Sequence, residues 1–121
     1  MDQRKALGAK GELAAEAFLK EQGVHILMKN YRCRFGEIDI IAKEGIYYLI
    51  IEVKTRKEYR QGMPAEAVNA VKQRKICRTF DYFRMRYHLS DETPVRFDVI
   101  EVDRALHCRW MKNAFEYQEI M

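Results

Sequence analysis

The sequence predicts an α/β fold in which a mixed β-sheet is flanked by helices. An N-terminal segment has a helical repeat, three consecutive segments are rich in β-branched and aromatic residues, and a second amphipathic segment precedes another strand-like one. The order helix, three strands, helix, strand favours a sheet completed by a helical crossover. With 121 residues, the chain is expected to be one domain over 1–121, with its core at about 5–103 and a C-terminal extension at 104–121.

The first helix is expected over residues 5–21 and ends at Gly23. Its buried stripe follows from three- and four-residue spacing and consists of Leu7, Gly11, Ala14, Ala15 and Phe18. Strands are expected over 24–34, 37–42 and 46–55, separated by Gly36 and by the turn Glu44-Gly45.

A polar loop over 56–63 leads to the second helix, which is expected to begin at Pro64 and to run to about His88. Its buried stripe is expected to consist of Val68, Val71, Ile76, Phe80, Phe83 and Tyr87. A turn at 90–94 and a strand over 95–102 follow. The segment 109–117 is ambiguous and could supply a last strand that includes Trp110.

Composition excludes several classes of protein. The three cysteines show no metal-ligand spacing, so neither a zinc site nor a disulfide framework is expected. Residues 1–10 lack the apolar stretch of a signal peptide, and the apolar run 46–51 is too short to cross a bilayer. We therefore expect a cytoplasmic protein without a membrane partner.

Positive charge is concentrated in one segment. Residues 54–86 contain ten Lys or Arg and three acids, which makes this segment +7 in a chain of net charge +4. Such an uneven distribution favours a polyanion, such as nucleic acid, as partner. A solvated helix face is the alternative, and charge alone does not decide between them.

Charged residues interrupt two strands that are otherwise hydrophobic. Glu37 and Asp39 share one face of the second strand, and Glu52 and Lys54 share one face of the third. Ionised groups on central strands are costly unless they are paired or bind a metal. Oxygen ligands of this kind suit Mg²⁺ or Mn²⁺, and a nearby lysine could hold the attacking water. A structural ion-pair cluster stays open as the alternative.

Two further acids stand near these strands. Glu12 lies at the edge of the buried stripe of the first helix, from which a carboxylate could reach the sheet or face solvent. Asp98 alternates with Phe97 and Val99 in the fourth strand, and a basic partner is its expected role.

Asp39, twelve intervening residues and then Glu52-Val53-Lys54 resemble the D…(E/D)xK signature of the PD-(D/E)XK nuclease superfamily. Five blocks in order extend the resemblance over residues 8–103: GxxGExxAxxFL (8–19), NYRxxxGEIDIIA (30–42), EVKTR (52–56), GxPxEAV with KQRK (62–75) and RFDVI (96–100). Together they resemble the YraN-like family of small bacterial proteins, usually described as predicted endonucleases and similar to archaeal Holliday junction resolvases. The proline that often precedes the aspartate is replaced here by Ile38.

This resemblance implies a restriction-endonuclease-like fold with an αβββαβ core. It also implies that Asp39, Glu52 and the carbonyl of Val53 are metal ligands, that Lys54 is the catalytic lysine, and that Glu12 is the helix acid found in some members. Lys72 or Gln73 would face the phosphate. Glu37 has no general role in the superfamily and would support a neighbouring ligand.

The hypothesis that follows is a Mg²⁺- or Mn²⁺-dependent nuclease, acting on branched or damaged DNA in particular. Residues after the lysine and on the second helix would bind nucleic acid: the basic Arg56, Lys57, Arg60, Lys72, Arg74, Lys75 and Arg78, and the neutral Gln73. A non-catalytic nucleic-acid-binding module and an accessory subunit in DNA processing stay open as alternatives. A homodimer would suit a two-fold branched substrate, with Trp110 either in its interface or in the core.

Overall fold

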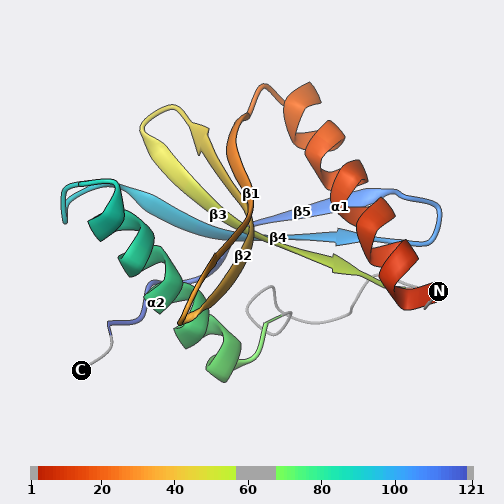
Figure 1. Cartoon of the computed structure of the whole chain (residues 1–121). Coiled ribbons are helices and arrows are strands. Elements are labelled where there is room, and N and C mark those ends of the chain that lie inside the picture. Colours follow the sequence, from red (N-terminus) through yellow and green to blue (C-terminus); the bar gives the residue numbers. More distant parts are fainter. Residues whose placement is uncertain (1–2, 57–67, 120–121) are drawn as a thin grey trace.

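The computed structural model describes residues 3–56 and 68–119 and shows a five-stranded mixed sheet between two helices (Figure 1). The elements in chain order are α1 (Gln3–Glu21), β1 (His25–Cys33), β2 (Gly36–Glu44), β3 (Tyr47–Thr55), α2 (Ala70–Arg86), β4 (Val95–Val102) and β5 (Cys108–Phe115). This arrangement confirms the predicted α/β class and is compatible with a restriction-endonuclease-like fold. The segment expected to be a C-terminal extension contributes β5, the edge strand beside β4.

The sheet has the order β1-β2-β3-β4-β5. Only β3 and β4 run parallel, because α2 carries the chain across between them, whereas the other neighbours are antiparallel. The β2–β3 ladder extends from Glu44↔Tyr47 to Ile40↔Ile51 and ends there. One residue further, where Asp39 and Glu52 follow, the two strands are no longer paired. We call this opening the β2–β3 gap.

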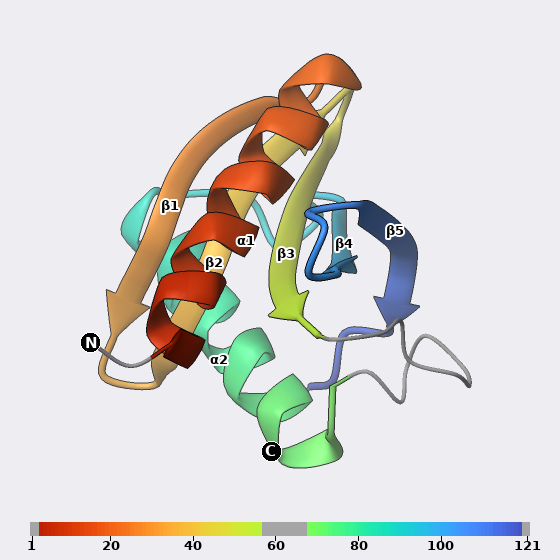
Figure 2. The ribbon, with the colours of Figure 1, turned by 90° about the vertical axis from the view of Figure 1, so that its right-hand side faces the viewer.

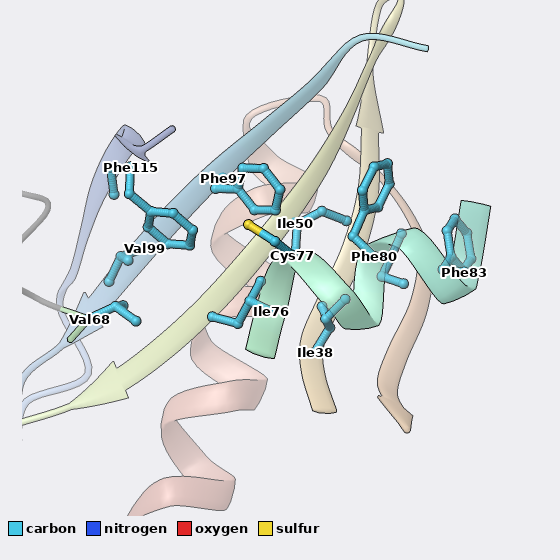
Figure 3. Packing of buried hydrophobic residues seen from close by; sticks show 12 residues of the cluster. Ile38, Ile50, Val68, Ile76, Cys77, Phe80, Phe83, Phe97, Val99 and Phe115 are labelled. Carbon is cyan, nitrogen blue, oxygen red and sulfur yellow. The ribbon is translucent and has the colours of Figure 1, made fainter. Parts of the chain in front are cut away.

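Each helix covers one face of the sheet (Figure 2). Under α2, the rings of Phe80 and Phe97 meet edge to face with centroids 6.1 Å apart, and Ile38 and Ile50 pack beside them (Figure 3). Under α1, Leu19 packs against strand residues on the opposite face of the sheet, among them Ile40 and Ile51. All three cysteines are free, as expected, and Cys77 is part of the α2-side core. Neither helix is long and apolar enough, over the described residues, to cross a membrane.

The second helix differs from its prediction in where it begins and which face it buries. Pro64 lies outside the described residues, but Asn69 precedes the helix as its N-cap and accepts a 2.9 Å hydrogen bond from the Lys72 amide. Val71 and Tyr87 were expected to be buried and are 55% and 46% exposed. Val71 lies five residues before Ile76, which is about 140° around the helix, so it points away from the buried face, and Tyr87 is the C-cap, beyond the regular helix.

The helix α1 approaches β3 closely at Gly11. A Cβ atom at this position would lie 2.2 Å from Thr55 Oγ1. We expect Gly11→Ala to lower the free energy of unfolding by about 1–3 kcal/mol in urea titrations, because overpacking forces neighbouring atoms to shift. Gly8→Ala is the matched control, because nothing lies within 4 Å of its added Cβ and alanine favours a helix. Combining Gly11→Ala with Thr55→Ala should restore stability; an unchanged single variant would contradict the close approach.

Candidate active site

The β2–β3 gap brings together the two acids of the D…ExK motif. Asp39 turns its side chain into the gap, where Oδ2 accepts a 2.9 Å hydrogen bond from the Val53 main-chain amide, and the carboxyl of Glu52 lies near enough for Asp39 to raise its pKa. The N–H and C=O groups of one strand residue project toward the same neighbour. The carbonyl of Val53 therefore projects toward the gap as well, so that two carboxyls and one main-chain oxygen converge there.

Glu52 is held in an unfavourable environment for a carboxylate. Its residue is only 2% exposed, and burial, followed by the Asp39 carboxyl, raises its pKa to about 9. Lys72 and Lys54 act in the opposite direction without overcoming this. The Oε1 atom is buried and has no hydrogen-bond partner among the described residues; Lys72 Nζ is 3.6 Å away. A buried oxygen without a hydrogen-bond donor is the kind of atom that a bound cation would satisfy.

Lys54 lies on the same face of β3 as Glu52, as the strand alternation predicted. Val53 and Ile51 take the opposite face, with the α1-side core. Lys54 is half-buried, and burial, followed by the ammonium of Lys72, lowers its pKa. Glu52 and Asp39 oppose this shift. The lysine is therefore closer to losing its proton than a lysine in water.

Glu12 reaches the same region from α1. It lines a pocket of about 220 Å³ together with Asp39, between α1 and the first two strands. Burial and then the Asp39 carboxylate raise the pKa of Glu12. Glu37 contributes to that rise and pairs with Arg32 at 3.4 Å. Of the two orientations that the sequence left open for Glu12, the structure therefore shows the one toward the sheet.

The donor set determines which metal ions the site can hold. Within residues 3–56 and 68–119, no three His, Cys, Asp or Glu side chains form a metal-binding group. The gap offers two carboxyls and the Val53 carbonyl, with one buried carboxyl oxygen that lacks a donor. Mg²⁺ is usually held by one or two carboxylates and keeps several waters, whereas structural zinc needs four protein ligands. The residues present fit Mg²⁺ or Mn²⁺ and do not fit structural zinc.

The structure places the predicted phosphate ligands in different surroundings. Lys72 stands beside Glu52, and Arg74 and Lys75 are exposed on α2. Gln73 is 9% exposed; its Nε2 donates to the Val68 carbonyl, and its Oε1 accepts from Gln118. Lys57 and Arg60 lie outside the described residues.

Arg56 and Arg78 also have protein partners. Arg78 lies over the ring of Phe35, with its guanidinium carbon 5.0 Å from the centroid. Arg56 Nε lies 2.8 Å from Glu101 Oε2, and Arg109 pairs with the other oxygen of the same carboxylate. Glu101 is fully buried and was missed in the sequence analysis. An acid between Ile100 and Val102 in a hydrophobic strand indicates a buried, paired carboxylate. Such a role was expected for Asp98 and not for Glu101.

Asp98 has the structural role that the sequence favoured. It is fully buried and receives hydrogen bonds from the Arg96 guanidinium, from Trp110 Nε1 at 2.8 Å and from the Asn113 amide at 2.9 Å. The expected basic partner is thus Arg96. These bonds join β4 to β5 beside the irregularity between Phe97 and Val99.

Comparison with known proteins identifies relatives along most of the chain. The model of "Uncharacterised protein family UPF0102" matches residues 11–102. A UPF0102 protein of Lachnoclostridium phytofermentans is 43% identical over 113 residues, which is 93% of this chain and 95% of that protein. One from Caldicellulosiruptor bescii is 50% identical over 99 residues (81% and 82% covered), and one from Legionella pneumophila strain Corby is 38% identical over 110 residues (90% and 93%). The matched region contains Glu12 and the whole β2–β3 gap, and the chain belongs to the uncharacterised family UPF0102.

Proposed function

We propose that this protein is a Mg²⁺- or Mn²⁺-dependent endonuclease that hydrolyses phosphodiester bonds in nucleic acid, with branched or damaged DNA as the first substrates to test. The observation that carries the proposal is the meeting of Asp39, Glu52 and the Val53 main chain in the β2–β3 gap. The resemblance of the sequence blocks to PD-(D/E)XK nucleases and to the YraN-like family supports the same reading.

The residues around the gap would have different roles in metal binding and in positioning the water. Asp39, Glu52 and the Val53 carbonyl would hold the ion, and Glu12 would add a carboxylate from the α1 side. A bound Mg²⁺ or Mn²⁺ supplies the positive charge that polarises a water and the phosphate. Lys54 would hold the attacking water; because its pKa is lowered, it can also take part in proton transfer. The water displaces the leaving oxygen in line at phosphorus.

Basic side chains near the gap would bind the flanking phosphates. Lys72 stands beside Glu52, and Arg74 and Lys75 project from the same helix into solvent. Lys57 and Arg60 follow β3 in sequence and would extend this contact, whereas Arg56 is already paired with Glu101. Phosphate contacts of this kind position a substrate without reading its sequence.

The test is a cleavage assay on branched, duplex and single-stranded DNA with Mg²⁺ or Mn²⁺. We expect Asp39→Ala and Lys54→Ala each to lower the cleavage rate by at least about a hundredfold, because each removes a group acting on the developing charge. Asp91→Ala is the matched control, because the Asp91 side chain is 98% exposed and lies outside the gap. Melting curves show whether each variant is folded.

Other outcomes would select the alternatives. Salt-sensitive binding without metal, and no cleavage under any divalent ion, would indicate a binding module. A stoichiometric protein partner with negligible affinity for DNA would indicate an accessory subunit. An unchanged cleavage rate in Asp39→Ala would contradict the assignment of the site.

The homodimer and the cytoplasmic location stay predictions. Trp110 packs edge to face on Phe18 at 6.0 Å and donates to Asp98, so it is engaged within the chain. A two-fold dimer would therefore take its contact area from other surfaces, and sedimentation analysis measures whether it forms.

A further inference from the structure

The β1–β2 turn carries a cluster of aromatic and basic side chains that the proposed chemistry does not use. Cys33 pairs with Gly36, so Arg34 and Phe35 form a two-residue turn. This turn lies against α2 (Figure 1), and the Phe35 ring meets Tyr82 with centroids 6.2 Å apart at an angle of 61°. We call Arg34, Phe35, Arg78 and Tyr82 the hairpin platform. Asn, Asp and Gly are usual in such turns, so turn geometry does not explain Phe35.

The platform is held in place by close packing under the turn. Gly36 has φ +154°, and a Cβ there would lie 3.0 Å from Thr79 Oγ1 on α2. The main-chain amide of Phe35 also donates a hydrogen bond to Cys33 Sγ, at 3.4 Å. The ring is therefore presented by a turn that is seated on a helix.

Two guanidinium groups converge on the Phe35 ring without a neutralising acid. The guanidinium carbons of Arg34 and Arg78 lie 4.9 Å and 5.0 Å from its centroid. Among the described residues, neither arginine forms an ion pair with a carboxylate; the nearby Asp81 is engaged by Arg84 and Tyr117. Like charges gathered in this way favour the binding of an anion.

Two hollows flank this cluster and share Arg34 and Tyr82. One measures about 330 Å³ and includes Phe35, Arg78 and Asp81, whose carboxylate pairs with Arg84; the other measures about 610 Å³ and includes Tyr31 and Arg86. Each hollow thus combines aromatic rings with arginines. Bases that are free of pairing stack on aromatic rings or guanidinium planes, while arginines bind the phosphates between them.

We propose that the hairpin platform binds unpaired nucleotides of a single-stranded nucleic-acid segment. The bases stack against Tyr82 and against the guanidinium planes of Arg34 and Arg78 that lie over Phe35, and the N–H groups of these arginines bind the phosphates. In a duplex these base faces are already stacked on their neighbours, so the platform selects unpaired strands. The proposal concerns binding alone and stands whether or not the protein hydrolyses its ligand.

The platform lies within reach of the β2–β3 gap. Along β2, Phe35 and Asp39 are four residues apart, which is about 13 Å at the rise of a strand. Along α2, Lys72 and Arg78 are six residues apart, which is about 9 Å at the rise of a helix. A strand bound on the platform would thus be only a few nucleotides from the carboxyls.

The test measures binding of a fluorescent thymidine oligonucleotide by anisotropy in EDTA, so that no cleavage takes place. We expect Phe35→Leu to weaken binding about tenfold, which corresponds to the stacking of one base. With a base-free chain of the same number of phosphodiester units, the same variant should bind as the wild type does. Arg34→Gln and Arg78→Gln should weaken binding of both chains and flatten the salt dependence by about one unit each.

Matched controls use exposed residues elsewhere. Tyr47→Leu removes an exposed aromatic ring at the β2–β3 turn, and Arg104→Gln removes an exposed charge between β4 and β5; neither should change the affinity. The proposal is overturned if Phe35→Leu binds the thymidine oligonucleotide as tightly as the wild type, if it loses as much affinity for duplex, or if a polyglutamate peptide binds equally well. Platform-dependent binding by a protein that never cleaves would keep this inference and reject the proposed function.

Discussion

Glu52→Gln is expected to raise the melting temperature of the metal-free protein at pH 8 and to abolish both its response to Mn²⁺ and its cleavage activity. The wild-type carboxyl is buried, touches Asp39 and has one oxygen without a hydrogen-bond donor among the described residues. An amide of the same shape is neutral at every pH, so folding requires no proton uptake at this position, and it can donate a hydrogen bond to the Asp39 carboxylate. It is also a poorer ligand for Mn²⁺ than a carboxylate. The substitution therefore separates stability from function.

The pH dependence follows from the raised pKa of Glu52. Its value of about 9 in the folded protein lies above the ordinary value of 4.5. As pH rises through this window, the unfolded chain releases the proton and the folded protein keeps it, so the free energy of unfolding falls. One pKa unit corresponds to about 1.4 kcal/mol, and we expect a net penalty on the order of 3 kcal/mol at pH 8. Below the ordinary value of 4.5, both states keep the proton and the penalty disappears.

Thermal melts at pH 5 and pH 8, with and without Mn²⁺, measure both effects. At pH 8 without metal, the variant should melt roughly 10 °C above the wild type, and the difference should shrink at pH 5. Mn²⁺ should stabilise only the wild type, because the proposed metal site needs the Glu52 carboxylate. Glu116→Gln, an exposed acid on the C-terminal segment, is the control and should change little. A variant that melts below the wild type at both pH values would show that Glu52 is a structural acid.

Asp98→Ala is expected to destabilise the protein by about 3–5 kcal/mol, the largest loss among the substitutions considered. The Asp98 carboxylate accepts hydrogen bonds from Arg96, Trp110 and the Asn113 amide. Its removal leaves a largely buried guanidinium and two N–H donors without their acceptor. Arg96 keeps a longer contact with Glu44 at 3.5 Å, which limits the loss.

Urea titration measures this effect, and Asp98→Asn is the informative companion. The asparagine keeps one oxygen acceptor and loses the charge, so its stability should fall between those of the alanine variant and the wild type. Neither substitution touches the β2–β3 gap. Any cleavage activity should therefore survive at temperatures where the variants are folded. A loss below about 1 kcal/mol in Asp98→Ala would contradict the anchoring role.

Residue periodicity predicted the elements well where packing is regular. The fourth strand was predicted to the residue at 95–102, and β3 differs by one residue. On β3, the alternation also placed Glu52 and Lys54 opposite Val53, because the side-chain period of a strand leaves no other choice. The predicted buried face of α2 was partly wrong, because Val71 is five residues from Ile76 and so lies off the stripe, and because the helix ends before Tyr87.

The difference between a structural acid and a functional acid could not be predicted from the sequence. Asp98, Glu101 and Glu52 all interrupt hydrophobic strands, and all three are buried. Asp98 is neutralised by Arg96, two residues earlier on the same strand, and Glu101 by Arg56 and Arg109, which are distant in sequence. Among the described residues Glu52 has no arginine partner, and its burial beside Asp39 emerges only when β2 and β3 separate. The residue periodicity of one strand does not reveal ion-pair partners that other strands supply.

Where β2 and β3 separate, the side chain and the main chain of Val53 have different roles. The side chain of Val53 packs with the α1-side core, while its amide binds Asp39 and its carbonyl projects toward the gap. Chemistry at this position therefore belongs to the main chain, which every amino acid except proline provides in full. The side chain of residue 53 matters for its volume and shape, so isoleucine could replace valine there without altering the main-chain groups of the proposed metal site.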